Sequence, residues 1–165
     1  MHDLIDHINR AAKFSETAAH CDIPCKIYDP SAAQVSALTV LRMVNLIQEM
    51  ESAGEVDAAA VHSMTRFVAT KEEHGSRCKD EIRIIWGDYF KAPQLERFPE
   101  IHELTHKIMM LASQCKQTVS RDKAHELVEA VNRFSEIFWA TKDVETKRAL
   151  CPYTPSVEVV YPDLT

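Results

Sequence analysis

Apolar residues recur every three or four positions through most of this chain, and no other feature of the sequence constrains the fold as strongly. The pattern covers four stretches, which are residues 31–52, residues 57–86, a third from Pro99 to Cys115 and a fourth from Ser120 or Asp122 to Thr141. The sequence contains three glycines, too few for an all-β fold with a turn about every 8–12 residues. Four amphipathic helices with short connections predict an all-α fold, an antiparallel up-down four-helix bundle over residues 31–142.

Local signals mark where these helices begin and end. Ser31 and Gln34 are three residues apart and have the form of a capping box at the start of the first helix. Gly54 is expected to end that helix, and Asp57 to cap the second. Residues 86–93 break the apolar period, so we predict a loop there.

The last part of the chain does not continue the helical pattern. Three prolines, Pro152, Pro155 and Pro162, surround the run Val157-Glu158-Val159-Val160-Tyr161. Proline cannot donate a backbone hydrogen bond and does not continue a helix. We therefore predict that residues 143–165 form an extended C-terminal tail.

Charge and cysteine usage exclude several classes of protein. The formal net charge of −6 argues against general nucleic-acid binding, which needs a clustered basic surface. No run reaches the ~18 apolar residues of a membrane span. The five cysteines are odd in number and mostly scattered, unlike a secreted disulfide framework. We expect a cytoplasmic protein that binds neither nucleic acid nor membrane.

Two thiols and an imidazole lie close together near the start of the chain, in the segment His20-Cys21-Asp22-Ile23-Pro24-Cys25. Cys21 and Cys25 are four residues apart, so they do not form a Cys-x-x-Cys redox pair. Pro24 opposes a helix, and two soft sulfur ligands on a non-helical segment suit a thiophilic transition metal. Taken alone, this cluster leaves a metal site, a redox site and incidental cysteines open.

Residues 1–19, which precede this cluster, allow two interpretations. Their apolar positions fit a short amphipathic helix at a frayed terminus, while the small residues just before His20 fit a removable leader. Cleavage between Ala19 and His20 would convert the His20 backbone nitrogen into a primary amine with a pKa of about 7.7–8.0. An internal residue cannot offer such a ligand.

The longer string His-Cys-Asp-x-Pro-Cys-x-x-Tyr-Asp-Pro, at residues 20–30, resembles the N-terminal nickel hook of the nickel superoxide dismutases. Three further segments extend the resemblance in the same order, so that it spans about residues 20–142. They are Trp86-Gly87-Asp88-Tyr89-Phe90-Lys91, Glu96-Arg97-Phe98-Pro99-Glu100-Ile101-His102 and Ile137-Phe138-Trp139-Ala140-Thr141-Lys142. The bundle of that family agrees with the four predicted helices.

The resemblance implies a metal site and an activity. A maturation protease would remove residues 1–19 and leave a nickel-binding hook, residues 20–30. One nickel ion per subunit would be held by the His20 amine, the Cys21 amide nitrogen and the thiolates of Cys21 and Cys25, with the His20 imidazole axial in the Ni(III) state. Square-planar N,S coordination is a geometry that nickel accepts. Ni(II)/Ni(III) cycling would convert two superoxide anions and two protons to O2 and H2O2.

The resemblance also implies roles for residues around the metal. Tyr28 and Tyr89 match tyrosines near the face where superoxide approaches, which order water, donate protons and limit access. Asp22 and Lys91 match residues that brace the hook, and Lys91 would add local positive charge. Two positions depart from the family: a carboxylate is frequent where this chain has Ser36, and an arginine near His74. Both are associated with orienting the axial imidazole.

The resemblance also implies partners for this chain, and the residues leave alternative functions open. The family assembles as a homohexamer, and a nickel chaperone is a candidate partner. A runner-up function is a non-catalytic helical bundle that stores or delivers nickel or copper, and a third is a bundle used only for protein interaction. The remaining candidates are expected to be structural: Cys78 and Cys115 as core residues, Cys151 as a free thiol, and His102 and His106 as surface histidines.

Overall fold

The structure, a computed structural model, describes residues 26–54 and 57–164. The expected leader and its cleavage site lie outside the described residues. So do four predicted site residues, His20, Cys21, Asp22 and Cys25.

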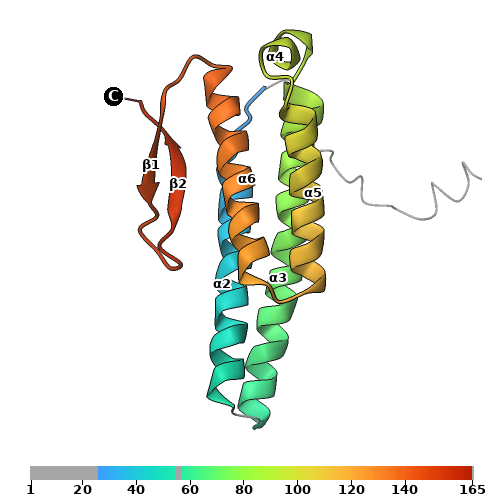
Figure 1. The fold of residues 1–165 in the computed structure, drawn as a ribbon, viewed down its shortest axis with the longest axis vertical. Coiled ribbons are helices and arrows are strands. Elements are labelled where there is room, and N and C mark those ends of the chain that lie inside the picture. The colour runs from blue at the N-terminus through green and yellow to red at the C-terminus, as the bar shows by residue number, and fades with distance from the viewer. Residues whose placement is uncertain (1–25, 55–56, 165) are drawn as a thin grey trace, which may run out of the picture.

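Four long helices form the body of the molecule: α2 Ser31–Ala53, α3 Ala58–Ile84, α5 Ile101–Gln117 and α6 Arg121–Ala140 (Figure 1). Each helix contacts two of the others, because α2 packs on α3, α3 on α5, α5 on α6 and α6 on α2. The largest fully buried side chains come from all four helices, among them Leu41, Ile82, Ile101, Ile108, Phe134 and Phe138. The predicted antiparallel four-helix bundle is confirmed.

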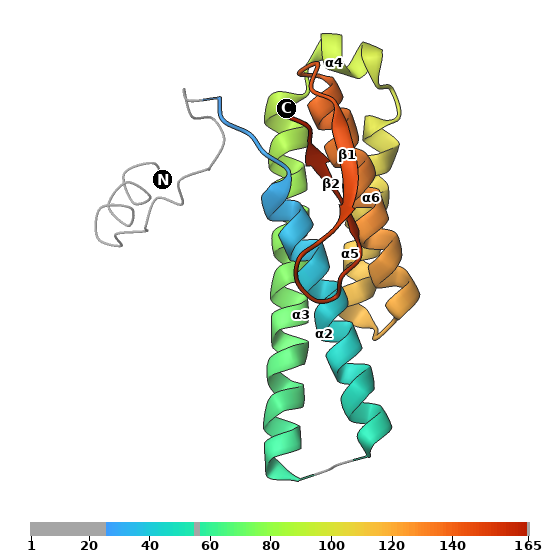
Figure 2. The same cartoon turned by 90° about the vertical axis from the view of Figure 1, so that its left-hand side faces the viewer.

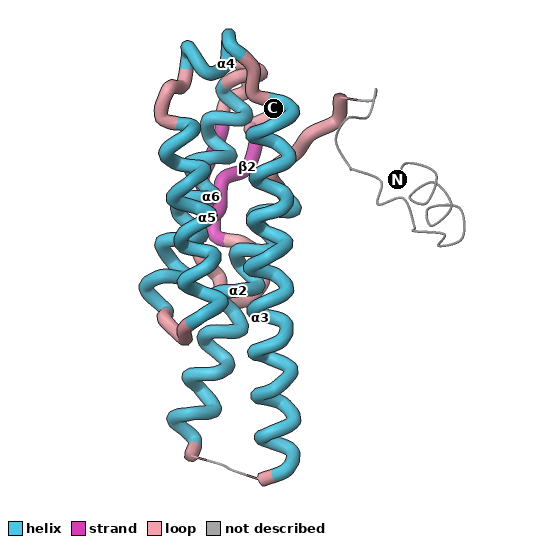
Figure 3. The backbone as a smooth tube through the Cα atoms, turned by 90° about the vertical axis from the view of Figure 1, so that its right-hand side faces the viewer, coloured by secondary structure: helices cyan, strands magenta, loops and turns pink. Residues whose placement is uncertain are grey.

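Helices α2 and α3 are longer than their partners. They have 23 and 27 residues, against 17 in α5 and 20 in α6. Figure 3 shows the pair extending past the other two helices at one end of the bundle. Apolar side chains at this end therefore lack the second pair of helices that covers them elsewhere.

Most of the predicted helix ends are confirmed. The Asp57 carboxylate accepts a hydrogen bond from the Ala60 backbone N–H at 2.7 Å, and Gly54 ends α2 with φ of 68°. Ser120 caps α6 by accepting from the Lys123 N–H at 3.3 Å. These side chains satisfy backbone groups that have no partner inside a helix.

The capping box predicted at the start of α2 is wrong. The N-cap residue is Pro30, and the Ser31 backbone N–H donates to the Asp29 carboxylate at 2.8 Å. The Gln34 side chain turns away from the helix start and donates to the Val160 carbonyl at 2.8 Å. A strand from the C-terminal part of the chain lies over this turn and offers Gln34 a buried acceptor, which a local pattern cannot anticipate.

Residues 86–93 are also more regular than the predicted loop. Helix α3 continues into a π-helical turn, η1 Ile85–Tyr89, in which the Phe90 N–H donates to the Ile85 carbonyl five residues earlier, at 3.4 Å. A short helix, α4 Ala92–Arg97, follows. The wider turn allows both Ile85 and Phe90 to be buried in the core, which offsets the poorer hydrogen bond.

The segment expected to be an extended tail folds back on the bundle. Strands β1 Thr146–Leu150 and β2 Glu158–Pro162 pair antiparallel, with Thr146 opposite Pro162 and Leu150 opposite Glu158. Figure 2 shows this hairpin lying along α6 and over α2. Val159, Val160 and Cys151 are buried there, so the hairpin contributes to the core.

Lys71, which interrupts the apolar stripe of α3, is buried rather than solvated. Its ammonium donates to the carbonyls of Cys115, Lys116 and Thr118 at 2.6, 2.9 and 2.9 Å. It therefore caps the C-terminus of α5, where carbonyl groups have no partner inside the helix. Burial lowers the pKa of Lys71 below its ordinary value, and Glu72 opposes that shift.

None of the described helices is both long and apolar enough to cross a membrane.

Candidate functional site

Two tyrosines meet at the end of the bundle where the described chain begins. Tyr28 precedes α2 and is half-buried, and Tyr89 is the last residue of η1. Their ring centroids are 5.7 Å apart with an angle of 52° between the planes. The ring of Tyr89 also packs on Phe90 and Phe138, at 5.3 and 4.9 Å. Aromatic pairs at these distances attract one another, so the cluster seats Tyr28 on the bundle.

The hydroxyl of Tyr89 has a defined partner. It lies 2.6 Å from Thr141 Oγ1, and the same Oγ1 lies 2.6 Å from the Phe138 carbonyl. A threonine hydroxyl has one proton, and the carbonyl can only accept. Thr141 therefore donates to Phe138 and accepts from Tyr89. The Tyr89 oxygen keeps its lone pairs available to accept a hydrogen bond from water.

Lys142 places a positive charge on this cluster. Its ammonium lies 4.8 Å from the centroid of the Tyr89 ring and 5.1 Å from that of Phe138, within the range of a cation–π contact. Lys91, for which sequence reasoning expected this role, is exposed and donates to the Gly87 carbonyl at 3.1 Å. In a protein with a net charge of −6, such local cations offset the repulsion of an anion.

Trp86 anchors η1 from the other side. Its indole N–H donates to His102 Nδ1 at 3.0 Å, and the two rings meet edge to face at 5.7 Å. His102 is therefore an exposed residue that holds η1 against α5, and His106 is exposed one turn later. Both histidines lie on the surface, as expected.

The two positions that depart from the family pattern differ in their hydrogen bonding. Ser36 is buried and its hydroxyl donates to the Ala32 carbonyl at 2.8 Å, one turn earlier in α2. Its proton is thus used inside its own helix, and only its lone pairs remain for another group. His74 Nδ1 is buried and has no hydrogen-bond partner among the described residues. A buried nitrogen without a partner is costly, so His74 is the better candidate for a polar contact.

The described cysteines are structural. Cys78 and Cys115 are fully buried, which confirms their assignment to the core. Burial raises the pKa of the Cys78 thiol to about 12 and that of Cys115 to about 11. Metals bind the thiolate, so these protonated thiols are poor ligands. Cys151 is a free thiol as expected, and it is buried, with Sγ 3.2 Å from the Tyr153 carbonyl.

Over residues 26–54 and 57–164, no group of three His, Cys, Asp or Glu side chains could hold a metal ion. The predicted ligands, in residues 20–25, lie outside this part of the chain, and their sequence supplies two thiols and an imidazole. That donor set fits nickel, because soft thiolates and nitrogen ligands suit a square-planar metal. Tyr28 is three residues beyond Cys25 in the sequence, and its packing on Tyr89 holds the start of the described chain against the bundle.

Tyr28 and Tyr89 were both expected from the sequence, and the structure brings them together. No role was expected for Thr141 or Lys142. Both lie just past the end of α6, where a lysine is common because it interacts with the C-terminal carbonyls. Only the placement of α6 beside η1 shows that these residues contact Tyr89.

The fold defines a class, an antiparallel four-helix bundle with an aromatic cluster where the described chain begins, and the sequence predicts a metal site ahead of α2. Comparison with known proteins then identifies the family. The family model described as nickel-containing superoxide dismutase matches residues 15–142. This chain belongs to the nickel-containing superoxide dismutase family.

Individual relatives agree with this assignment. A superoxide dismutase [Ni] of Streptomyces coelicolor is 33% identical over 125 residues, covering 76% of this chain and 89% of the relative. A superoxide dismutase [Ni] of Streptomyces seoulensis is 31% identical over 127 residues, covering 77% and 91%. The native nickel superoxide dismutase structure at 1.30 Å is similar with a TM-score of 0.65 and 30% identity, covering 75% of this chain and 99% of that one.

Proposed function

We propose that this chain dismutes superoxide at a nickel ion held by residues 20–25. Family membership supports the activity: the protein is a nickel superoxide dismutase, an oxidoreductase with one nickel ion per subunit. The alternative, a bundle that stores or delivers nickel or copper, is not favoured by these matches. The observation that supports the location of the site is the packing of Tyr28, near the end of the proposed hook, on Tyr89.

The proposed ligands are the amine and imidazole of His20, the amide nitrogen and thiolate of Cys21, and the thiolate of Cys25. When bound, nickel supplies the Ni(II)/Ni(III) couple, through which one superoxide is oxidised to O2 and a second is reduced, with two protons, to H2O2. Ligand binding requires deprotonated thiols, so nickel affinity is expected to fall with falling pH.

The residues around the proposed metal site would control access to it and orient water beside it. Tyr28 and Tyr89 would limit access by size and order the water that carries protons to the reduced product. Thr141 holds the Tyr89 hydroxyl, so the phenol presents its lone pairs in a fixed direction. Asp22 and Lys91 would brace the hook, while Lys142 beside Tyr89 adds the positive charge that attracts an anion.

The proposal includes maturation and location. A protease would cleave between Ala19 and His20, because only then does His20 carry the primary amine that the ligand set requires. A nickel chaperone is a further candidate partner. We also propose a cytoplasmic location, since Cys78, Cys115 and Cys151 are free thiols, which a reducing compartment maintains.

A homohexamer is the proposed assembly. The projecting end of α2 and α3 supports self-association, because it carries an apolar groove of about 730 Å³ lined by Ile47, Met50, Val61, Met64 and Val119. Val61 and Val119 are 55% and 42% exposed in the single chain. Exposed apolar patches rimmed by polar residues are typical of protein interfaces.

The experiment that tests the function uses protein co-expressed with nickel and its maturation protease. Intact mass, metal analysis and superoxide turnover are measured on one preparation. We expect a chain that begins at His20, with about one nickel per chain and high turnover. Nickel without turnover would favour storage, and a mature chain that binds no nickel would contradict both functions.

Two variants locate the ligands. Cys21→Ser should lose nickel and turnover, while Cys151→Ser, which changes a buried thiol outside the hook, should retain both. Extension of the mature terminus by one alanine replaces the amine of His20 with an amide. We expect loss of activity with the helical circular dichroism retained, and full activity would refute the terminal-amine ligand.

A further inference from the structure

The C-terminal hairpin lies beyond the part of the chain that matches the family, which ends at residue 142. It is nonetheless well packed, since Val159 and Val160 of β2 are almost completely buried. The Asp163 N–H donates to the Glu145 carbonyl at 2.7 Å, and the Cys151 N–H donates to the Val157 carbonyl at 3.0 Å, so both ends of the hairpin are closed. A segment fixed this firmly has a defined position relative to the bundle.

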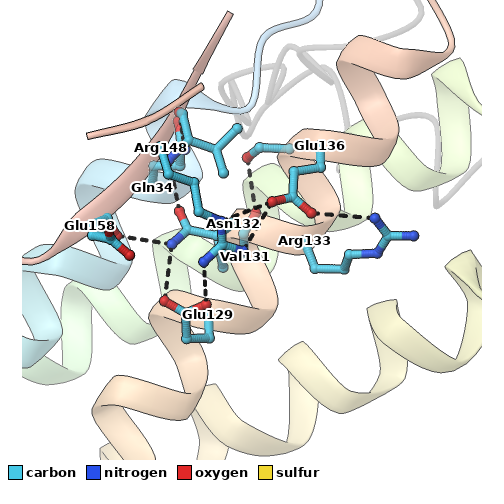
Figure 4. A network of polar contacts seen from close by, with 10 residues as sticks. Gln34, Glu129, Val131, Asn132, Arg133, Glu136, Arg148 and Glu158 are labelled. Carbon is cyan, nitrogen blue, oxygen red and sulfur yellow. Dashed lines mark hydrogen bonds and ion pairs between the residues drawn. The ribbon is translucent and has the colours of Figure 1, made fainter. Parts of the chain in front are cut away.

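Buried amide side chains from two helices join β2 to the bundle. Gln34 of α2 donates to the Val160 carbonyl at 2.8 Å, and the Val160 N–H donates to the Asn132 side-chain oxygen of α6 at 3.2 Å. Asn132 also donates to the Glu158 carbonyl at 3.0 Å. Figure 4 shows Gln34 and Asn132 at this junction, with the contact between Asn132 and Glu158. The backbone N–H and C=O groups on the edge of β2 that does not pair with β1 are thus hydrogen-bonded by side chains of α2 and α6, in place of a third strand.

The contact to α2 is made next to the root of the hook. Gln34 is in the first turn of α2, and its backbone N–H donates to the carbonyl of Pro30 at 3.0 Å. Pro30 is buried and is the last residue of the proposed hook, 20–30. We propose that the hairpin clamps the first turn of α2 and so fixes where the nickel-binding hook leaves the bundle. Gln34 is then a positioning residue, and this inference rests on the proposed function.

A second contact holds the hairpin without touching α2. Arg148 of β1 forms ion pairs with Glu129 and Glu136 of α6, at 2.8 and 2.9 Å. Figure 4 shows both carboxylates on the same side of α6 as Asn132. Arg148 therefore offers a matched control, because its loss loosens the hairpin but leaves the bond between Gln34 and Val160.

The test compares Gln34→Met and Arg148→Gln in the mature protein that begins at His20. Nickel(II) affinity is measured by competition with a chelator of known affinity, and hydrogen exchange is measured at residues 26–34. Groups that hydrogen-bond directly to metal ligands typically contribute about 10–100-fold to affinity, and Gln34 acts through the backbone at the root of the hook, so the low end of this range applies. We expect Gln34→Met to weaken nickel binding by about tenfold and to speed exchange at residues 26–34, with Arg148→Gln close to wild type in both.

Several results would overturn the clamp. It fails if Gln34→Met leaves nickel affinity unchanged, whether or not exchange becomes faster. The assignment of Gln34 as the positioning residue fails if Arg148→Gln weakens binding equally, because the effect would then not depend on the bond between Gln34 and Val160. Exchange at residues 26–34 can be compared without nickel, so a variant with poor metal recovery still tests the contact. Failure of the unsubstituted mature protein to bind nickel would instead contradict the proposed function.

Discussion

The hydroxyls of Tyr89 and Thr141 lie 2.6 Å apart and connect the end of η1 to the end of α6. Because Thr141 Oγ1 donates to the Phe138 carbonyl at 2.6 Å, the phenol of Tyr89 is the donor in this pair. The proton of the phenol is thereby held away from other acceptors, while its oxygen can still accept a hydrogen bond. Tyr89 is oriented by residues that take no part in metal binding.

Tyr89→Phe removes the hydroxyl and keeps the ring, so it distinguishes the contributions of the two. The ring contacts with Tyr28 and Phe138 are kept, so the free energy of unfolding should fall by only about 1 kcal/mol, the net value of one hydrogen bond. Superoxide turnover should fall by about tenfold, less than the ~10²–10⁴ of a positioned proton donor, because Tyr89 orders water without giving up its own proton and Tyr28 retains its hydroxyl. Pulse radiolysis and thermal melts check these values. Thr141→Val is the control that keeps the phenol, and unchanged turnover in Tyr89→Phe would contradict the assigned role.

Lys71→Met should be strongly destabilising. The substitution leaves the carbonyls of Cys115, Lys116 and Thr118 without their shared donor at the end of α5. Buried acceptors that lose their partner cost about 1–3 kcal/mol each, partly offset because a buried charge is removed, so we expect a net loss of about 3 kcal/mol. Urea unfolding measures it. Lys107→Met, at an exposed position of α5, should change stability little.

Alkaline pH should weaken the fold through two buried thiols. Burial raises the pKa of Cys78 from 9.0 to about 12 and that of Cys115 to about 11. A raised folded-state pKa means that the native state binds more protons than the unfolded chain between these values. Stability is therefore fully present below pH 9 and falls as pH rises towards 11–12, by up to about 1.4 kcal/mol per pH unit for each thiol.

The variant Cys78→Ala tests this linkage. Its unfolding free energy should be lower than that of wild type at pH 8, because a buried group is removed, but should decline less steeply between pH 9 and 10.5. Urea titrations at several pH values give both slopes. Parallel slopes in the two proteins would show that other groups control the alkaline transition.

Local patterns predicted the bundle well where the partners of a residue are near in sequence. Asp57 caps α3 through Ala60, three residues on, and Gly54 ends α2 through its own backbone conformation. The capping box at Gln34 failed because its partner, Val160, is 126 residues away. Lys71 resembled an interruption of α3 for the same reason, since its acceptors belong to another helix.

The sequence likewise indicates some residues of the candidate site but not those whose contacts depend on the fold. Resemblance to a family predicts a hook whose metal ligands lie outside the described residues, and it also pointed to Tyr28 and Tyr89, which the structure places in contact. Thr141 and Lys142 lie more than 50 residues from Tyr89, and their contacts depend on how α6 ends beside η1. The π-helical turn that places Tyr89 there is too short to produce a recognisable apolar period in the sequence.

Helices α3 and α5 approach closely at Gly75. A Cβ on Gly75 would lie 2.8 Å from Lys116 Cγ, and Lys116 cannot move freely since its ammonium donates to Ser76 at 2.8 Å. In wild type, Gly75→Ala should cost about 1–3 kcal/mol of overlap against about 1 kcal/mol gained in helix propensity, so the net loss is up to about 2 kcal/mol. In a Lys116→Ala background the overlap disappears, so the same substitution should stabilise by about 1 kcal/mol. Urea unfolding of the four proteins in this cycle measures both effects, and an equal effect in the two backgrounds would mean that the contact between Gly75 and Lys116 does not limit the packing of α3 on α5.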